Sequence, residues 1–154
     1  MLARLTFDDL RVGDRFDIGR YDMTREEVME FAGKYDPQPW HLDDEAAAAN
    51  PVFGRLSASG WHTTVIFSLL ADRFWKSTSV RGLAGGGMDQ VRWLTPVFPG
   101  DRLSGSLEVL TIRPSASKPE RGIMSMAGSL HNDEGVQVLS AQLSGIFARS
   151  LPSG

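Results

Sequence analysis

The spacing of apolar residues predicts a strand followed by a helix near the N-terminus. Residues 15–23 alternate between apolar and polar side chains, which is typical of a strand with one buried face. Thr24 and Glu27 then match the T-x-x-E pattern of a helix capping box. The helix that they open is predicted to stop near Asp36, because Pro37 disfavours helical geometry in the residue before it.

Two further helices are expected in the next forty or so residues. Asp43 or Asp44 can cap a short alanine-rich helix that ends at Asn50–Pro51. After a loop, residues 59–75 form a helical pattern with apolar side chains on nearly every side. A helix of this kind is expected to be buried rather than to lie on a surface.

The C-terminal half has the pattern of an antiparallel sheet. An extended stretch is interrupted by three glycines, and three segments of strand-like alternation follow it, with a hairpin loop between the last two. The extended stretch covers residues 80–94, and the three strand-like segments cover 102–112, 121–131 and 136–148. The hairpin loop covers residues 132–135. One strand, short helices, one buried helix and four strands fit an antiparallel sheet wrapped around a single long helix. We therefore expect the α+β class, with one domain over residues 1–154.

Composition narrows the class of protein. The chain has 154 residues, a net charge of −3 and no cysteine, so disulfides, thiol nucleophiles and thiolate metal sites are excluded. The acidic balance gives no support for a nucleic-acid surface. A continuous apolar run long enough to span a membrane is absent, and the first ten residues lack the apolar core of a signal peptide. These features predict a soluble, cytoplasmic protein without a membrane partner.

One segment combines groups that can carry chemistry. Asp36 and His41 lie five residues apart, and Pro37 and Pro39 stiffen the chain between them. In an irregular loop both side chains can converge on one small volume, where a carboxylate and an imidazole can move protons to and from water. Gln38 lies between them and can orient a carbonyl group or a water. The spacing alone leaves a second interpretation open, in which the acid caps a local turn and the histidine is an ordinary loop residue.

This segment resembles the signature of the MaoC-like dehydratase family, which includes the R-specific enoyl-CoA hydratases. The family pattern is an aromatic-Ala helix end, then Gly-Asp-x-Asn-Pro-aliphatic-His-x-Asp. Phe31 and Ala32 match the helix end, and four later positions fall in register: Asp36, Pro39, His41 and Asp43. Gln38 stands where the family has Asn, and Tyr35 stands where it has Gly. These departures bear on the range of substrates.

The resemblance extends over most of residues 12–148. FGRLSASGWHT at 53–63 is similar to the family's stretch before and into its central helix, and MDQVRWLTPVFPGDRL at 88–103 is similar to a later strand, its proline break and a Gly-Asp turn. The resemblance implies a hot-dog fold and a homodimer or a higher oligomer. It also implies hydration of a trans-2-enoyl thioester, on CoA or an acyl carrier protein, to an (R)-3-hydroxyacyl thioester, with no metal and no other cofactor.

The resemblance also implies roles for individual residues. Asp36 and His41 would be the catalytic pair, and the substrate would be held by Gln38, Ser59, Gly60 and Trp61. The Gly60 N–H, at the start of the long helix, would bind the thioester oxygen. The absent Cβ of this glycine would let the thioester approach closely. Ser59 is also expected to be the N-cap of that helix.

Two other functions remain open at this point. A hot-dog thioesterase would need a carboxylate on the central helix, and the first one there is Asp72, near its end. A non-catalytic module that binds acyl thioesters is the other alternative. His62 could be a second acid/base group but is expected to be a packing residue, and His131 is expected to face solvent. Three basic residues around a Pro/Ser-rich loop are expected to be solvated rather than to bind CoA phosphates: Arg113, Lys118 and Arg121.

Overall fold

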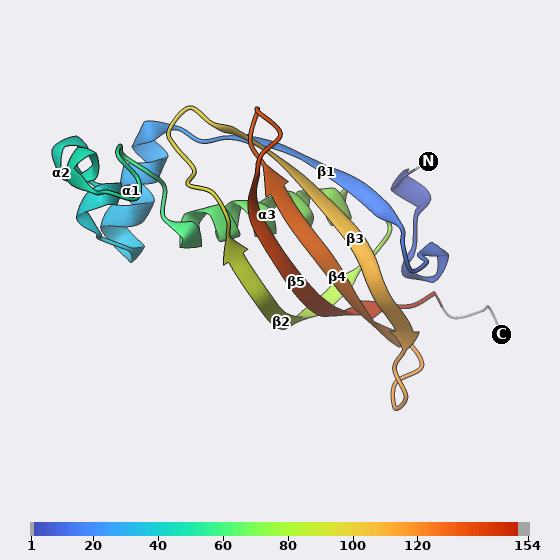
Figure 1. Cartoon of the computed structure of the whole chain (residues 1–154). Helices are drawn as coiled ribbons and strands as arrows, with labels where there is room; N and C mark the ends of the chain where they lie inside the picture. The colour runs from blue at the N-terminus through green and yellow to red at the C-terminus, as the bar shows by residue number, and fades with distance from the viewer. Residues whose placement is uncertain (1, 151–154) are drawn as a thin grey trace.

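The structure is a computed structural model that describes residues 2–150. Its helices and strands follow the predicted order (Figure 1). The helices are α1 (Arg25–Tyr35), α2 (Asp44–Ala49) and α3 (Gly60–Lys76), with single 3-10 turns at Leu2–Arg4, Phe7–Asp9 and Pro39–His41. The strands are β1 (Arg15–Asp22), β2 (Gly82–Trp93), β3 (Arg102–Pro114), β4 (Arg121–His131) and β5 (Gln137–Ala148). The prediction of one domain over 1–154 includes residues 1 and 151–154, which lie outside the described part.

The five strands form one antiparallel sheet that lies against the long helix. Its spatial order is β1-β3-β4-β5-β2, so β1 and β2 are the two edges. Helix α3 runs along one face of the sheet, and α1 and α2 gather at the end where α3 begins (Figure 1). The predicted α+β arrangement, with a sheet around a central helix, is confirmed.

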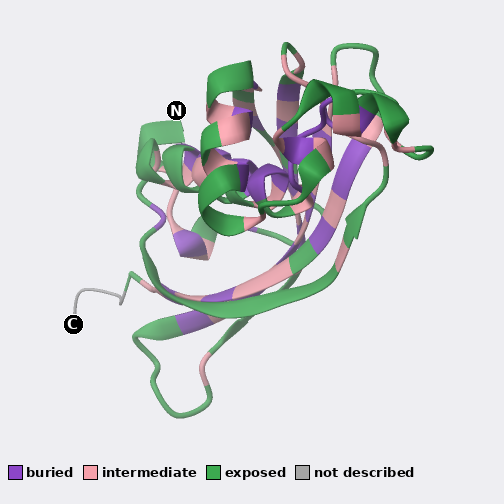
Figure 2. Ribbon diagram, turned by 90° about the vertical axis from the view of Figure 1, so that its left-hand side faces the viewer, coloured by how far each residue is buried: buried purple, intermediate pink, exposed green. Residues whose placement is uncertain are grey.

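Alternation along the strands builds the core between sheet and helix. In β4 every second residue is buried from Gly122 to Leu130, because successive side chains of a strand point to opposite faces. The inner face of the sheet meets the buried face of α3, which includes Ile66, Phe67 and Leu70. In Figure 2 the buried residues lie on the central helix and on the strands that pack against it, whereas the hairpin loops are exposed. This packing fixes where the first turn of α3 lies.

A glycine of the sheet makes room for the central aromatic ring of the helix. A Cβ built on Gly128 would lie 2.1 Å from Cζ of Phe67, and the Phe67 side chain is fully buried. Protein interiors are packed too closely to absorb such an overlap without a shift of neighbouring atoms. Gly128 therefore sets the close approach of α3 to β4.

Helix α3 is not buried on every side, so that prediction is wrong for the single chain. Trp61 and Val65 are 59% and 50% exposed and form an outward stripe along one side of the helix. Edge strand β2 is exposed along nearly its whole length. It continues through the three glycines as a strand, but its pairing with β5 shifts register three times, and Gln90 has a positive φ of 51°.

None of the helices in the described range 2–150 is long and apolar enough to cross a membrane.

We predict that Gly128→Ala destabilises the fold. The added methyl group would overlap the buried Phe67 ring, and overpacking of a core costs roughly 1–3 kcal/mol. Gly85→Ala is the matched control, because nothing lies within 4 Å of its built Cβ. Urea denaturation should show a lower midpoint for the first variant and little change for the second. Equal midpoints would contradict this account of the sheet–helix contact.

Candidate active site

The loop after α1 brings the predicted acid and histidine together. Asp36 is the C-cap of α1, and its N–H donates to the Ala32 carbonyl at 2.9 Å. The chain then turns through the 3-10 segment Pro39–His41. The two prolines prevent α1 from continuing, and the turn directs the His41 side chain back toward the helix end. Asp36 Oδ2 lies 3.6 Å from His41 Nε2.

Hydrogen bonds fix the orientation of the imidazole. His41 is buried, and its Nδ1 lies 2.6 Å from the Ser57 carbonyl oxygen. A carbonyl oxygen can only accept, so in the neutral ring Nδ1 carries the proton and Nε2 presents a lone pair. The Nε2 lone pair faces the carboxylate of Asp36.

Ser59 connects the acid to the start of α3. Its hydroxyl donates to Asp36 Oδ2 at 2.7 Å and accepts from the Trp61 N–H at 3.2 Å. The predicted N-cap role of Ser59 is therefore confirmed. Ser59 is fully buried, so the structure places it behind Asp36 and not on the wall of a cavity.

Asp36 and His41 share a cavity of about 490 Å³ at the first turn of α3. Gln38 and Gly60 also line it, as do aromatic and aliphatic side chains. The rest of the wall comes from the loop before α3, the end of β2 and the loop after it, and includes Trp40, Phe53, Trp93, Pro96 and Val97. Among residues 2–150, Asp36 is its only acidic lining residue. A mostly apolar pocket with a few converging polar groups is typical of a small-molecule site.

Trp93 is a wall residue that the sequence did not indicate. A Cβ built on Gly60 would lie 2.3 to 2.6 Å from atoms of the Trp93 indole, and the indole N–H donates to the Thr64 hydroxyl at 3.0 Å. The space beside Gly60 is therefore filled by the indole. The expectation that the absent Cβ leaves room for the thioester is therefore wrong in the single chain, because Trp93 occupies that side of Gly60. Gly60 still lines the cavity.

Two residues of interest lie outside this cavity. Trp61, predicted to hold the substrate, is not among the lining residues. Its ring meets that of Trp93 edge to face, with the ring centroids 5.2 Å apart. Tyr35, the departure from the family glycine, is 62% exposed and packs on Phe31. Of the two departures, only Gln38 therefore faces the cavity in the single chain.

A second buried polar cluster lies one turn further along α3. His62 is 1% exposed and stacks on Phe31 with the ring centroids 4.6 Å apart. Its Nε2 lies 3.4 Å from Glu27 Oε1, and Nδ1 has no hydrogen-bond partner within the described residues. Burial lowers the pKa of His62, although the Glu27 carboxylate opposes the shift. The prediction that this histidine is a packing residue fits its position.

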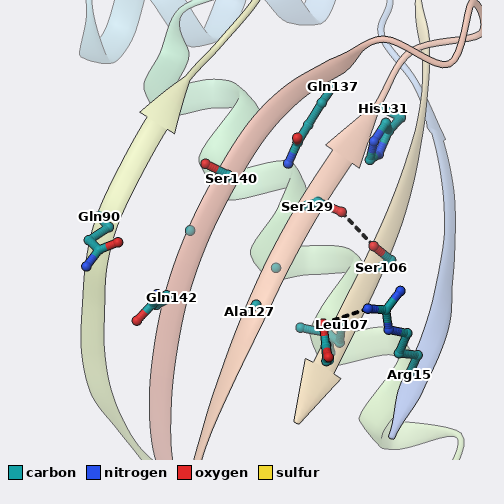
Figure 3. A pocket seen from close by; sticks show the side chains of 13 residues that line it. Arg15, Gln90, Ser106, Leu107, Ala127, Ser129, His131, Gln137, Ser140 and Gln142 are labelled. Carbon is teal, nitrogen blue, oxygen red and sulfur yellow. Dashed lines mark hydrogen bonds and ion pairs between the residues drawn. The ribbon is translucent and has the colours of Figure 1, made fainter. Parts of the chain in front are cut away.

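A second hollow lies on the outer face of the sheet and has a mostly polar lining, unlike the cavity at α3. It has a volume of about 450 Å³, and mostly polar side chains from all five strands line it (Figure 3). Ser106 and Ser129 hydrogen bond to each other at 2.6 Å, and Arg15 pairs with Glu108 at 3.3 Å. These groups satisfy one another, and the acid and histidine of the signature lie elsewhere. We therefore assign the functional site to the cavity at α3.

Two further observations concern residues outside the cavity. Residues 2–150 contain no group of three or more His, Asp or Glu residues that could hold a metal ion. The β3–β4 hairpin lies at the end of the sheet opposite α1 and α2 (Figure 1). Its three basic residues are therefore far from the cavity of the same chain: Arg113, Lys118 and Arg121.

Comparison with known proteins identifies the class. The family model described as "MaoC like domain" matches residues 11–124. The curated protein YdeM of Bacillus subtilis, itself uncharacterized, is 30% identical over 146 residues, which is 94% of this chain and all of that protein. The chain therefore belongs to the MaoC-like dehydratase domain family.

Solved structures agree with this class. A MaoC-like dehydratase from Rhodospirillum rubrum is 36% identical, with a TM-score of 0.80 over 96% of this chain and 99% of that one. An R-hydratase from Pseudomonas aeruginosa has a TM-score of 0.69 at 24% identity, over 96% and 94% of the two chains. The second likeness shows the fold alone. The fold is the hot-dog arrangement that the sequence resemblance implied.

We predict that protonation of His62 contributes to acid destabilisation. Its pKa is lowered in the folded chain, so below about pH 6.5, the ordinary histidine value, the unfolded chain binds a proton that the folded chain does not. The free energy of unfolding therefore carries no His62 penalty above pH 6.5, and it falls as pH drops below 6.5 by at most about 1.4 kcal/mol per pH unit. Urea denaturation at pH 7.5 and 5.5 should show that the free energy of unfolding falls less for His62→Gln than for wild type. Equal losses would exclude this contribution.

Proposed function

We propose that the chain catalyses reversible addition of water to a trans-2-enoyl thioester, carried by CoA or an acyl carrier protein, to give an (R)-3-hydroxyacyl thioester. The observation that carries the proposal is the pairing of Asp36 and His41 at 3.6 Å in a shared, largely apolar cavity. The family supplies the reaction class, since it is that of the MaoC-like dehydratases, and an R-hydratase shares the fold.

The pair is arranged to hold one water molecule. Asp36 presents a carboxylate oxygen and His41 presents the Nε2 lone pair, so a water between them can donate one hydrogen to each. Its oxygen lone pairs then point away from the pair, into the cavity. The Ser59 and Ser57 hydrogen bonds hold both acceptors in place before any substrate arrives, which is the preorganisation that proton transfer needs.

The addition follows from this arrangement. The water oxygen forms a bond to C3, one of its protons passes to the Asp36–His41 pair, and the electrons of the C2–C3 double bond move toward the thioester oxygen. The resulting enolate then takes a proton at C2 from the same pair, and the second hydrogen of the water remains on the new hydroxyl. Dehydration is the reverse sequence.

Charge on the thioester oxygen needs a donor near the cavity. The Gly60 N–H belongs to the first turn of α3, where backbone donors have no partner inside the helix and the helix dipole is positive. Because Gly60 lines the same cavity as the catalytic pair, we assign its N–H this role. A fixed backbone donor of this kind stabilises an oxyanion without reorganisation.

Thioester hydrolysis has less support from the geometry. The central helix has no acid that lines the cavity, and Asp72 pairs with Lys76 at 2.7 Å near the other end of α3. Asp36 is held beside a histidine, which suits proton transfer through water rather than direct attack on a carbonyl.

We also propose that two copies pair through β2 and the outward stripe of α3. β2 is an edge strand with unpaired backbone groups, and such edges are usually covered. Exposed apolar side chains lie on both elements: Trp61, Val65, Leu83, Met88 and Trp93. Pairing there would cover the side of the cavity that Trp93 forms.

We predict that Asp36→Asn and His41→Ala each lower turnover by about 100-fold or more, because each removes one of the two proton acceptors. The assay follows loss of the enoyl-thioester absorbance with crotonyl-CoA and longer trans-2-enoyl-CoAs. His131→Ala is the matched control, since His131 lies in the hollow on the outer face. Release of free thiol, or no turnover of any substrate by folded wild type, would reject the hydratase proposal.

For the dimer, we expect sedimentation equilibrium to give twice the chain mass for wild type. Val65→Asp, on the outward stripe of α3, should shift the equilibrium toward the monomer because it would bury a charge at the interface. Val12→Asp, in the turn before β1 and 64% exposed against 50% for Val65, should not. A monomeric wild type would reject the assembly.

A further inference from the structure

Glu27 does not complete the capping box that its position predicts. Thr24 accepts the Glu27 N–H at 3.3 Å, as a cap should. The Glu27 carboxylate is directed elsewhere, where it accepts the Tyr21 hydroxyl at 2.7 and 2.8 Å and lies 3.4 Å from His62 Nε2. The three side chains come from β1, α1 and α3. The carboxylate is therefore a junction between three elements.

His62 is suited to be a neutral donor in this junction. It is buried, and its Nδ1 has no acceptor among the described residues. A doubly protonated ring would leave an N–H unsatisfied in the core, which is costly. The neutral ring with its proton on Nε2 can direct that N–H toward the Glu27 carboxylate, 3.4 Å away, and leaves only a lone pair unpaired. Stacking on Phe31 holds the ring plane against α1.

The junction lies two to three turns of α1 away from Asp36. Glu27 is in the first turn of α1, and Asp36 is its C-cap. On α3, His62 follows Ser59, the N-cap, by three residues. Helix α1 is thus joined to α3 by polar contacts at both of its ends, Glu27–His62 and Asp36–Ser59. These two polar contacts restrain both ends of α1 against α3, in addition to the burial of Val28 and Ala32 along the helix.

We propose that His62 and Glu27 are positioning residues that hold Asp36 in register with Ser59 and His41. His62 does not line the cavity, so it acts through the placement of α1 and not on the substrate. The proposal rests on the hydratase function proposed above for its kinetic readout. It also makes a structural claim that does not depend on activity.

The kinetic test compares a variant that removes the donor with one that restores it. His62→Leu should lower kcat on the order of 10-fold to 100-fold with little change in KM, because small misplacements of a reacting group cost factors of this size. His62→Gln keeps an N–H donor at the end of the side chain and should recover most of the loss. Ile66→Val is the control for a general loss of stability. Ile66 is buried one turn further on and has no polar link to α1, so this variant should lower Tm without lowering kcat.

A double variant separates positioning from general loss of structure. If His62 acts through Asp36, then His62→Leu should cost almost nothing further in the Asp36→Asn background, because residues that act as a unit are not additive. The same fold loss in both backgrounds would overturn the proposal. So would wild-type kcat in His62→Leu, or failure of His62→Gln to recover activity.

Crystal structures of the two variants test the structural claim even if wild type turns over no enoyl thioester. His62→Leu should lengthen the separation of Ser59 Oγ and Asp36 Oδ2 from 2.7 Å to beyond hydrogen-bond reach, whereas His62→Gln should keep it. An unchanged hydrogen bond in His62→Leu would overturn the positioning role. Absence of turnover with the expected displacement would instead reject only the hydratase function.

Discussion

The hydrogen bond from the Ser59 hydroxyl to the Asp36 carboxylate joins the end of α1 to the start of α3. It places the acid of the signature at the point where the central helix begins, next to backbone donors that the helix cannot use itself. The same region holds His41, whose ring is fixed by the Ser57 carbonyl. Every contact proposed for the chemistry depends on these two helix ends meeting at one place.

The sheet sets the position of that meeting point. The ring of Phe67 lies where only a glycine fits on β4, and alternating inner-face residues of β3 and β4 complete the contact with α3. Because the buried face of α3 packs against the sheet, the first turn of α3 has a fixed position relative to the end of β2. Trp93 then closes the cavity from that strand. The fold therefore positions the site through the packing of α3 against the sheet.

Local patterns were sufficient to predict most of the fold. Alternation located the strands within a few residues, and Thr24 and Ser59 were correctly interpreted as caps, because these signals depend on neighbours in the chain. Of the two candidates Asp43 and Asp44, the structure uses Asp43. The outward side of α3 was missed, since apolar residues at Trp61 and Val65 look the same whether sheet or a second molecule covers them. Periodicity cannot distinguish the two cases.

The site was predictable where its parts lie in one segment. Asp36, His41 and Gln38 line the expected cavity, because a proline-stiffened loop keeps them together. The contacts of Trp93 with Gly60 and of Glu27 with His62 join positions more than thirty residues apart. Glu27 even matched a local motif whose second half the structure does not use. Contacts of this kind follow from tertiary packing, and a single sequence contains no signal for them.

The proposed acid, base, water-orienting and oxyanion groups all fall between residues 36 and 60, whereas the sheet contributes only walls. Chemistry and scaffold are thus encoded in separate stretches of the chain. In a duplicated gene, one copy can lose its reactive segment by drift while its strands still fold into the same sheet. Divergence of this kind changes what enters the cavity or whether it reacts, and leaves the architecture in place.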